Sequence, residues 1–282
     1  MNLPIFTTPG ELDRYLQCHR SRSIGFVPTM GALHLGHQGL IDRARTENNT
    51  VIVSIFVNPL QFGANEDLDR YPRQLELDLV LCQSAGVDAL FVPTTESIEI
   101  ADTLTQVIPP PAMMSGLCGC SRIGHFQGVA TIVTKLFNIV RPDRAYFGEK
   151  DAQQLAIVRR IVRDLYIPVE IVGCPTIRAD SGLALSSRNQ YLSPLGRSQA
   201  AVIYRSLQQA QLLAQQGEQN ARSLLAVVAH ELATVPEFQL EYLELVDLDT
   251  LQSIDTLSQP ALVAIAGRIE NTRLIDNIVI GK

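Results

Sequence analysis

The sequence predicts an α/β protein whose first domain is a doubly wound parallel sheet and whose second is a smaller α+β domain. Through residue 175, short apolar runs alternate with segments in which apolar residues recur at helical spacing. Strands separated by helices in this way form a parallel sheet with helices on both faces. Beyond Pro175, two helical patterns precede three strand patterns, so we divide the chain into domains 1–175 and 176–282.

The pattern assigns each element a residue range. The expected strands of the first domain are 23–28, 50–57, 89–92, 144–147 and 169–172, and the expected helices are 35–45, 75–85, 126–138 and 153–165. In the second domain we expect helices over 195–217, ended by Gly217, and 219–234, and strands over 238–246, 261–266 and 272–280. Ligands of doubly wound sheets bind beyond the carboxyl ends of the strands, so polar motifs there are the candidate site.

Composition restricts the class of protein. Of the 282 residues, 46% are hydrophobic and 18% are charged, the balance of a folded globular chain. The net charge of −6 gives no general attraction to nucleic acid or anionic membranes. The N-terminal segment has no signal-peptide pattern, and no apolar run approaches the roughly 18–20 residues of a membrane span. We therefore expect a cytoplasmic protein that binds neither nucleic acid nor membrane.

Five cysteines are an odd number, which favours free thiols in a reducing cytosol. The alternative is a zinc site at Cys118, Cys120 and His125. The two cysteines lack C-x-x-C spacing, and no second Cys/His pair accompanies them.

The strongest chemical motif is residues 28–37, PTMGALHLGH, between a predicted strand and a predicted helix. Gly31 and Gly36 allow the backbone to approach a phosphate, and a helix N-terminus adds unpaired N–H groups and a positive dipole end. His34 and His37 are three residues apart, so both imidazoles can project to one side. There they could donate hydrogen bonds to phosphate oxygens and stabilise the charge that develops when a carboxylate attacks an α-phosphorus. The alternative is a pair of loop histidines satisfied within the protein.

A second motif, residues 56–62 (FVNPLQF), follows the second strand. Asn58 and Gln61 supply neutral donors and acceptors suited to the hydroxyl and carboxylate groups of a small polar substrate. Tyr71 and Asp78 come next, and Asp78 could help to hold a magnesium ion. The alternatives are a plain turn after the strand and an exposed helix carboxylate.

Two further motifs place cations ahead of predicted helices. In residues 122–129 (RIGHFQGV), Arg122 could pair with phosphate, although a structural turn is the alternative. In residues 148–154 (GEKDAQQ), Lys150 follows a strand and is suited to clamp a phosphate. Asp151 could cap the next helix as well as contact a ligand. A surface cluster of charges is the alternative.

The last motif is residues 185–189, LSSRN. The hydroxyls of Ser186 and Ser187 and the guanidinium of Arg188 can bind triphosphate oxygens together. The preceding Ser-Gly pair, residues 181–182, predicts mobility, and we expect this loop to close on ATP. A Ser-rich linker is the alternative.

These motifs resemble known families. H-x-G-H alone resembles the nucleotidyltransferase superfamily with its Rossmann-like sheet. Four segments in order resemble the pantoate–β-alanine ligase (pantothenate synthetase) family: PTMGALHLGH, FVNPLQF, GHFQGVATIVTKLFNIVRPDRAYFGEKDAQQL and ALSSRNQYL, with RLIDN near the end. The resemblance implies that the carboxylate of (R)-pantoate attacks the α-phosphate of Mg-ATP. Pantoyl-adenylate then acylates β-alanine, giving pantothenate and AMP.

The resemblance also implies residue roles. It assigns ATP contacts to Met30, His34, His37, Gly148, Lys150, Asp151, Ile177, Leu185, Ser186, Ser187 and Arg188. Among these, His37, His34 and Lys150 would be catalytic. It assigns pantoate to Gln61 and Gln154, with Asn58, Arg122 and Tyr71 near the substrates and Asp78 near magnesium. It further implies a homodimer whose C-terminal domain is a lid.

The sequence departs from the family in two places. Leu185 stands where Met is common, a change we expect to matter little, and Ile123 stands where Pro or a polar residue is usual, which bears on Arg122. Some relatives add a cytidylate kinase domain, but these 282 residues contain no Walker A motif, so we expect no kinase activity from them. Three alternatives are less favoured: a nucleotidyltransferase that stops at a dinucleotide, a tRNA-charging enzyme and a nucleotide sensor without turnover.

Overall fold

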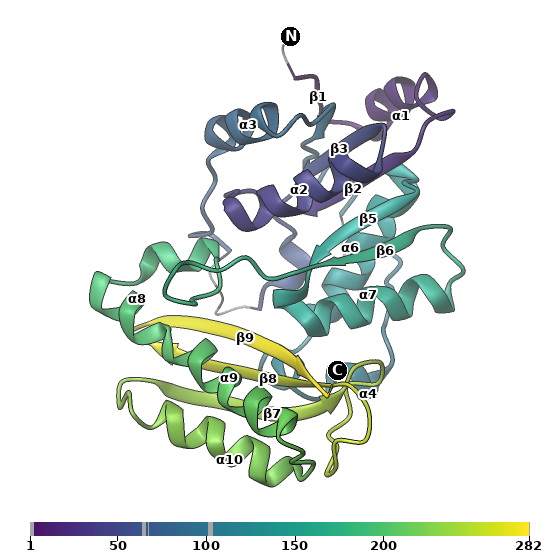
Figure 1. Cartoon of the computed structure of the whole chain (residues 1–282). Helices are drawn as coiled ribbons and strands as arrows, with labels where there is room; N and C mark the ends of the chain where they lie inside the picture. Colours follow the sequence, from purple (N-terminus) through teal and green to yellow (C-terminus); the bar gives the residue numbers. More distant parts are fainter. Residues whose placement is uncertain (1–2, 64–65, 67, 101–103, 282) are drawn as a thin grey trace. The chain divides into compact units, whose positions relative to one another are not determined.

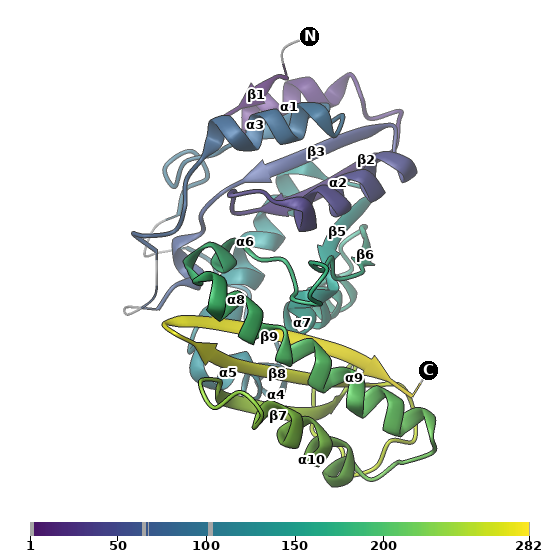
Figure 2. The same ribbon diagram turned by 60° about the vertical axis from the view of Figure 1, so that its left-hand side comes forward.

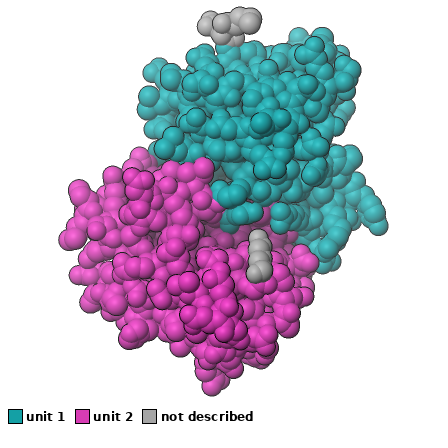
Figure 3. All heavy atoms as spheres, in the orientation of Figure 1, with its two compact units in different colours: residues 1–109, 122–149, 157–175 teal, residues 110–121, 150–156, 176–282 magenta. Residues whose placement is uncertain are grey.

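The computed structural model describes residues 3–63, 66, 68–100 and 104–281. The chain forms two compact units, coloured in Figure 3. Unit 1 consists of residues 1–109, 122–149 and 157–175, and unit 2 consists of residues 110–121, 150–156 and 176–282. The assignment of the two predicted domains as a nucleotide-binding domain and a lid stays a prediction.

Unit 1 is built on a six-stranded sheet in which every pair of neighbours is parallel (Figures 1 and 2). The strand order is β1-β4-β3-β2-β5-β6. The bounds are β1 (Ile5–Phe6), β2 (Ile24–Thr29), β3 (Thr50–Ile55), β4 (Ala89–Phe91), β5 (Arg144–Gly148) and β6 (Glu170–Cys174). The predicted doubly wound sheet is confirmed, with β1 as an edge strand that the apolar pattern did not predict.

Helices cover both faces of this sheet. They are α1 (Pro9–Gln17), α2 (Leu35–Glu47), α3 (Leu75–Ser84), α6 (His125–Val140) and, from residue 157 on, α7 (Ala152–Asp164), with the 3-10 turn η1 (Pro59–Gln61) after β3. Successive side chains of a strand point to opposite faces of the sheet, so neighbouring residues of β2 pack against different helices. Phe26 meets Phe137 of α6 edge-on, with ring centroids 6.4 Å apart. Val27 belongs to the buried cluster that contains Ile41 of α2.

Unit 2 is built on a three-stranded antiparallel sheet in the order β7-β8-β9. The strands are β7 (Gln239–Asp247), β8 (Ala261–Ile269) and β9 (Thr272–Ile280), and the short helices and turns are α4 (Pro111–Met114), α5 (Cys118–Ser121), η2 (Glu149–Asp151) and η3 (Ser187–Tyr191). The longer helices are α8 (Pro194–Ala200), α9 (Val202–Gln215) and α10 (Ala221–Leu232). Leu207 of α9, Val228 of α10 and Val263 of β8 lie in one buried core. The predicted α+β character of the second domain is therefore confirmed.

The prediction of one continuous helix over 195–217 is wrong. The chain forms α8 and α9 instead, and they meet at Ala201. The Ala201 N–H donates to the carbonyl of Ser198, three residues back, so the last turn of α8 is tighter than an α-helix. The alanine-, glutamine- and leucine-rich composition favours helix on both sides and carries no mark of this break.

All five cysteines are free thiols. The sulfur of Cys118 lies 3.2 Å from the hydroxyl of Tyr242 and 3.6 Å from a guanidinium nitrogen of Arg273, contacts that attach α5 to β7 and β9. Among the described residues, no group of three or more His, Cys, Asp or Glu side chains is arranged to hold a metal ion. The described helices also include none with the length and apolar character to cross a membrane.

Candidate active site

The histidine motif forms the turn between β2 and α2 in unit 1. His34 is the N-cap of α2, and its Nδ1 accepts a hydrogen bond from the N–H of Gly36 at 3.1 Å. The Nδ1 of His37 accepts from the N–H of His34 at 3.3 Å. The two rings are thus arranged as a capping box built from imidazoles, with centroids 4.2 Å apart. Backbone donors at the helix start hold both histidines in place.

These bonds determine the tautomer of each ring. A backbone N–H can only donate, so the Nδ1 of His34 and the Nδ1 of His37 must each carry a lone pair. The hydrogen of each neutral ring is therefore on Nε2. A doubly protonated ring would lose its backbone contact. The turn accordingly fixes two half-buried neutral imidazoles, each with an Nε2–H donor, at the N-terminus of a 13-residue helix.

The backbone of this turn is held by a carboxylate of α3. Asp78 is 1% exposed, and its Oδ2 accepts from the N–H of Ala32 at 3.0 Å while Oδ1 accepts from the N–H of Leu33 at 2.7 Å. The sequence predicted Asp78 as a possible magnesium ligand. The carboxylate contacts backbone donors in the structure, and its magnesium role stays a prediction.

The second motif adjoins the first, because Thr29 at the end of β2 pairs with Ile55 at the end of β3. The buried Asn58 amide donates to Gln61 Oε1 and to the carbonyl of Gly128, both at 3.1 Å. Its Oδ1 accepts from the N–H of Leu60. Asn58 therefore orients the Gln61 side chain, whose Nε2 lies 2.9 Å from the Met30 sulfur.

A glycine of the third motif permits this arrangement. A Cβ on Gly128 would lie 2.1 Å from the carbonyl oxygen of Leu60, so no other residue fits where α6 meets η1. In the sequence, Gly128 is only one member of the RIGHFQGV motif ahead of a predicted helix. The structure places it within α6, against the segment that carries Gln61.

Arg122 lies in a network around the Gln61 carbonyl. Its guanidinium donates to both carboxylate oxygens of Glu66, at 2.7 and 2.5 Å, and to the Gln61 carbonyl at 3.3 Å. Nδ1 of His125 lies 2.8 Å from the same carbonyl, and its Nε2 lies 3.0 Å from Arg122. Since a carbonyl only accepts and a guanidinium only donates, His125 is neutral with its hydrogen on Nδ1. Burial opposes ionisation of Glu66, but Arg122 outweighs it and lowers the pKa of that carboxyl.

Other predicted residues of unit 1 lie around these motifs. Tyr71 is buried with its ring edge-on to Phe62, at a centroid distance of 5.9 Å. Gly148 is the last residue of β5 and pairs with Cys174. It therefore lies at the same carboxyl-terminal edge of the sheet as the histidine turn.

In unit 2, Lys150 and Asp151 belong to η2, and Asn277 of β9 donates to the Lys150 carbonyl at 2.9 Å. Gln153 and Gln154 follow with different surroundings. Gln153 is buried and bonds to the backbone of residues 113, 116 and 118, whereas Gln154 is half-buried. The latter is the glutamine that the family resemblance assigns to pantoate.

The predicted ATP loop is a hydrogen-bonded hairpin followed by η3. The N–H of Leu185 donates to the carbonyl of Ile177 at 2.9 Å, and Arg178 bridges to Ala184. Ser186 caps η3 by accepting from the N–H of Arg188 at 3.3 Å, and Ser187 is the first residue of that turn. The loop that was expected to be mobile is therefore extensively bonded to itself, and its closure on ATP stays a prediction.

One ion pair anchors this loop to β9. Arg178 forms two hydrogen bonds with Asp276, at 2.6 and 2.9 Å, and Asp276 is 4% exposed. The same guanidinium donates to the Gly182 carbonyl and stacks 3.6 Å from the ring centroid of Tyr204. Arg178 and Glu66 both lie outside the sequence motifs and were not predicted as site residues. For Asp276, the sequence signal was its position in RLIDN, one of the segments that resemble the ligase family.

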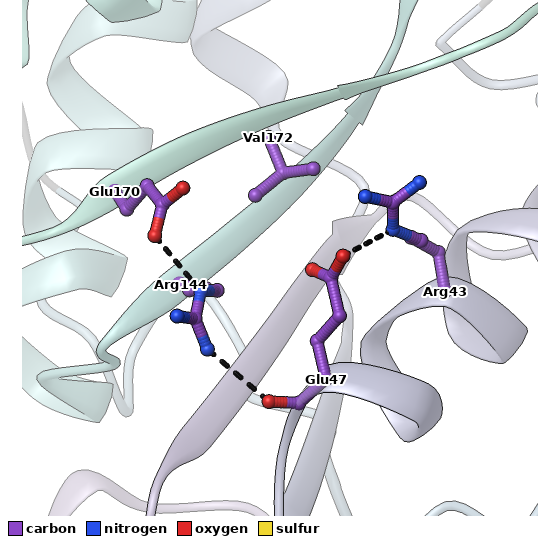
Figure 4. A pocket seen from close by; sticks show the side chains of 5 residues that line it. All are labelled: Arg43, Glu47, Arg144, Glu170 and Val172. Carbon is purple, nitrogen blue, oxygen red and sulfur yellow. Dashed lines mark hydrogen bonds and ion pairs between the residues drawn. The ribbon is translucent and has the colours of Figure 1, made fainter.

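A separate hollow of about 330 Å³ lies at the opposite, amino-terminal edge of the parallel sheet (Figure 4). It is lined by Arg43, Glu47, Arg144, Glu170 and Val172. Its charges are paired with one another, since Arg43 bonds to Glu47 and Arg144 to Glu170. None of the sequence-predicted site residues lines it.

Comparisons with known proteins agree with the motifs. The family model for pantoate-beta-alanine ligase matches residues 4–279. A bifunctional pantoate ligase/cytidylate kinase of Trichormus variabilis is 58% identical over 264 residues, covering 92% of this chain and 49% of the relative. The corresponding protein of a Synechocystis species is 53% identical over 282 residues, covering 98% and 55%. The chain thus spans about half the length of the curated relatives it matches.

Solved structures give the same result. Pantothenate synthetase from Thermus thermophilus superposes with a TM-score of 0.93 at 48% identity, covering 98% of this chain and 99% of that one. Pantoate-beta-alanine ligase from Francisella tularensis, complexed with beta-gamma ATP and beta-alanine, has a TM-score of 0.81 at 36% identity, covering 98% and 97%. With the histidine turn, the Asn58–Gln61 pair and the six-stranded parallel sheet, these matches show that the chain belongs to the pantoate–β-alanine ligase family.

Proposed function

We propose that the chain condenses (R)-pantoate with β-alanine at the expense of ATP, giving pantothenate, AMP and pyrophosphate through a pantoyl-adenylate. One observation carries the proposal: the histidine turn presents two neutral Nε2–H donors at a helix N-terminus. Neutral donors and a helix dipole suit a phosphate whose negative charge increases during attack. Family membership supplies the substrate class.

In the first step a pantoate carboxylate oxygen attacks the α-phosphorus of ATP, and pyrophosphate leaves. We assign the Nε2–H groups of His34 and His37 to the α-phosphate oxygens and to the oxygen that bridges to the leaving group. Fixed donors of this kind contribute about 10²–10³ in rate each, because they need no reorganisation as charge develops. Lys150 and Arg188 add positive charge for the triphosphate.

In the second step the neutral amine of β-alanine attacks the acyl carbon of the adenylate. The amide bond forms, AMP leaves with the electron pair of the broken C–O bond, and the amine releases a proton. The Francisella relative, which was crystallised with beta-gamma ATP and beta-alanine, supports both ligands for this chain. Gln61, oriented by Asn58, is assigned to pantoate together with Gln154.

The remaining family assignments complete the proposal. ATP would contact Met30, His34, His37, Gly148, Lys150, Asp151, Ile177, Leu185, Ser186, Ser187 and Arg188, and Tyr71 would lie near the substrates. Arg122 is paired with Glu66, so we assign it a supporting place beside Gln61. Magnesium enters as part of the Mg-ATP substrate. We also propose, from the family resemblance, a homodimer, which sedimentation of the purified chain tests, and we keep the cytoplasmic location expected from the sequence.

The decisive experiment follows pyrophosphate and AMP release from Mg-ATP with pantoate, with and without β-alanine. We expect pyrophosphate to require pantoate, and AMP with pantothenate to require β-alanine as well. Binding of ATP without either product would show that the substrate class is wrong. A dinucleotide product would instead favour a nucleotidyltransferase that forms no amide.

A further inference from the structure

The carboxylate of Asp78 lies beneath the histidine turn. We propose that Asp78 is a positioning residue, which holds the backbone of residues 31–33 so that His34 and His37 present their Nε2–H groups to the nucleotide. The inference rests on the proposed function, because its consequence for catalysis needs the reaction assigned above. It gives Asp78 a different role from the magnesium ligand that the sequence predicted.

Asp78 is buried beneath the turn and contacts two of its backbone donors. Its side chain is almost fully buried, yet it is a carboxylate on the first turn of α3. Each oxygen accepts one N–H, from Ala32 at 3.0 Å and from Leu33 at 2.7 Å. A buried carboxylate needs such donors, and the positive end of the α3 dipole adds to them. The N–H groups of these two successive residues therefore solvate the buried carboxylate.

The backbone shape of the turn also fits a positioning role for Asp78. Gly31 and Ala32 both have positive φ, +82° and +52°. For alanine this left-handed conformation is unfavourable, so surrounding contacts must impose it. A Cβ on Gly31 would lie 2.9 Å from Ile55 and 3.0 Å from an oxygen of Asp78. The carboxylate and the left-handed backbone thus fit each other, and Leu33 leads directly into the N-cap His34.

The geometry does not suit a magnesium ion on this carboxylate. Magnesium in proteins usually keeps several waters, and a side chain 1% exposed with a backbone N–H on each oxygen offers no room for a hydrated ion.

Asp78→Asn tests the proposal with little change of shape. The asparagine oxygen can keep one backbone bond, but its NH₂ faces a second N–H donor, so the turn is released on one side. Glu76→Gln is the matched control, because Glu76 is an exposed carboxylate of the same helix turn. Three quantities are measured: kcat and KM for pantoate-dependent pyrophosphate release, the magnesium dependence, and amide hydrogen exchange over residues 30–35.

We expect Asp78→Asn to lower kcat about 10–100-fold and to accelerate exchange at Ala32 and Leu33 at least 10-fold, with half-saturation by magnesium within twofold of wild type. Glu76→Gln should change none of these by more than twofold. Weakened magnesium dependence with unchanged exchange would instead identify a metal ligand and overturn the proposal. Loss of thermal stability with wild-type kcat would overturn it also, since Asp78 would then serve stability alone.

The wild-type chain provides a test that does not need the variant to fold. With or without magnesium, the amides of Ala32 and Leu33 should exchange at least 100-fold more slowly than exposed loop amides. Exchange at the rate of exposed loop amides would show that Asp78 does not hold these two N–H groups. The measurement needs no substrate, so it tests the contact even if the wild-type chain releases no pyrophosphate. That second result would count against the proposed function alone.

Discussion

Two buried carboxylates, one in each unit, hold candidate site segments by different means. Asp78 in unit 1 accepts backbone N–H groups of Ala32 and Leu33, so it fixes the main chain. Asp276 in unit 2 pairs with the guanidinium of Arg178, so it fixes a side chain, which in turn holds the loop. The first device needs only a carboxylate and a turn, whereas the second also needs one particular basic residue.

The difference determines what a substitution should do. Loss of a carboxylate that fixes main chain changes the direction of the histidines and should appear in the rate. Loss of a carboxylate that pairs with arginine leaves a cation with poor solvation and should appear first in stability.

His37 should give the largest effect, because it is the proposed donor itself. Asparagine at this position can replace the Nδ1 acceptor of the N–H of His34 but cannot place a donor where Nε2 lies. Glutamine can place its amide nitrogen near that point. We expect His37→Asn to lower pantoate-dependent pyrophosphate release about 10²–10³-fold and His37→Gln to recover part of it. Single-turnover kinetics measure the step, with circular dichroism as the control for folding.

Equal losses in the two His37 variants would mean that the Nε2–H donor is not what matters. Near wild-type rates in both would remove His37 from the proposed mechanism. The comparison between units would then rest on the positioning contacts alone.

Asp276→Asn should give the next largest effect, this time on stability. The side chains of Arg178 and Asp276 are only 16% and 3% exposed, so removing the negative charge leaves a guanidinium poorly solvated. We expect a loss of about 2–3 kcal/mol in the free energy of unfolding, measured by urea denaturation. Asp164→Asn is the matched control, since that carboxylate pairs with Arg160 at the surface and is 41% exposed. The control should lose less than about 0.5 kcal/mol.

If both variants lost the same small amount of unfolding free energy, the Arg178–Asp276 pair would contribute no more to stability than a surface ion pair. A rise in KM for ATP in Asp276→Asn, with kcat little changed, would support the view that the pair places the ATP loop. A fall in kcat alone would make the two carboxylates equivalent in function and would end the contrast drawn between the units.

Features that neighbouring residues encode could be predicted from the sequence. The sheet of unit 1 followed from apolar runs, and the histidine turn followed from glycines and histidines within ten residues at the end of a strand. One missed element had a local pattern: α1 is capped by a capping box of Thr8 and Glu11, a Thr-x-x-Glu arrangement that marks a helix start. The two-residue strand β1 offered no comparable pattern.

The positioning contacts could not be predicted in the same way. Asp78 lies 46 residues from Ala32, and Arg178 lies 98 residues from Asp276. Nothing in the local spacing says which acid meets which donor, because the fold alone brings them together. For the same reason, Asp78 fits a magnesium role by residue type, whereas its burial and its donors are visible only in three dimensions.

The Glu66–Arg122 pair should give the smallest effect, and it sharpens the contrast within unit 1. Arg122 is about as exposed as Arg178, at 17% against 16%, but the Glu66 side chain is 24% exposed where Asp276 is 3%. Water can therefore solvate the guanidinium once the acid is gone. We expect Glu66→Gln to lower the free energy of unfolding by about 0.5–1 kcal/mol at pH 7, less than Asp276→Asn.

The pH dependence of this pair has a definite sign. Because the folded state lowers the pKa of Glu66 from its ordinary value of 4.5, the pair stabilises the fold above that value. The contribution is lost as the pH falls through the folded-state pKa, where Glu66 becomes protonated. The difference in unfolding free energy between wild type and Glu66→Gln should therefore be constant from pH 7 to 5.5 and shrink below pH 4.5. A difference that persists at pH 3 would show that Glu66 acts through packing. The exposure of the acid would then not explain why the Glu66–Arg122 pair contributes less stability than the Arg178–Asp276 pair.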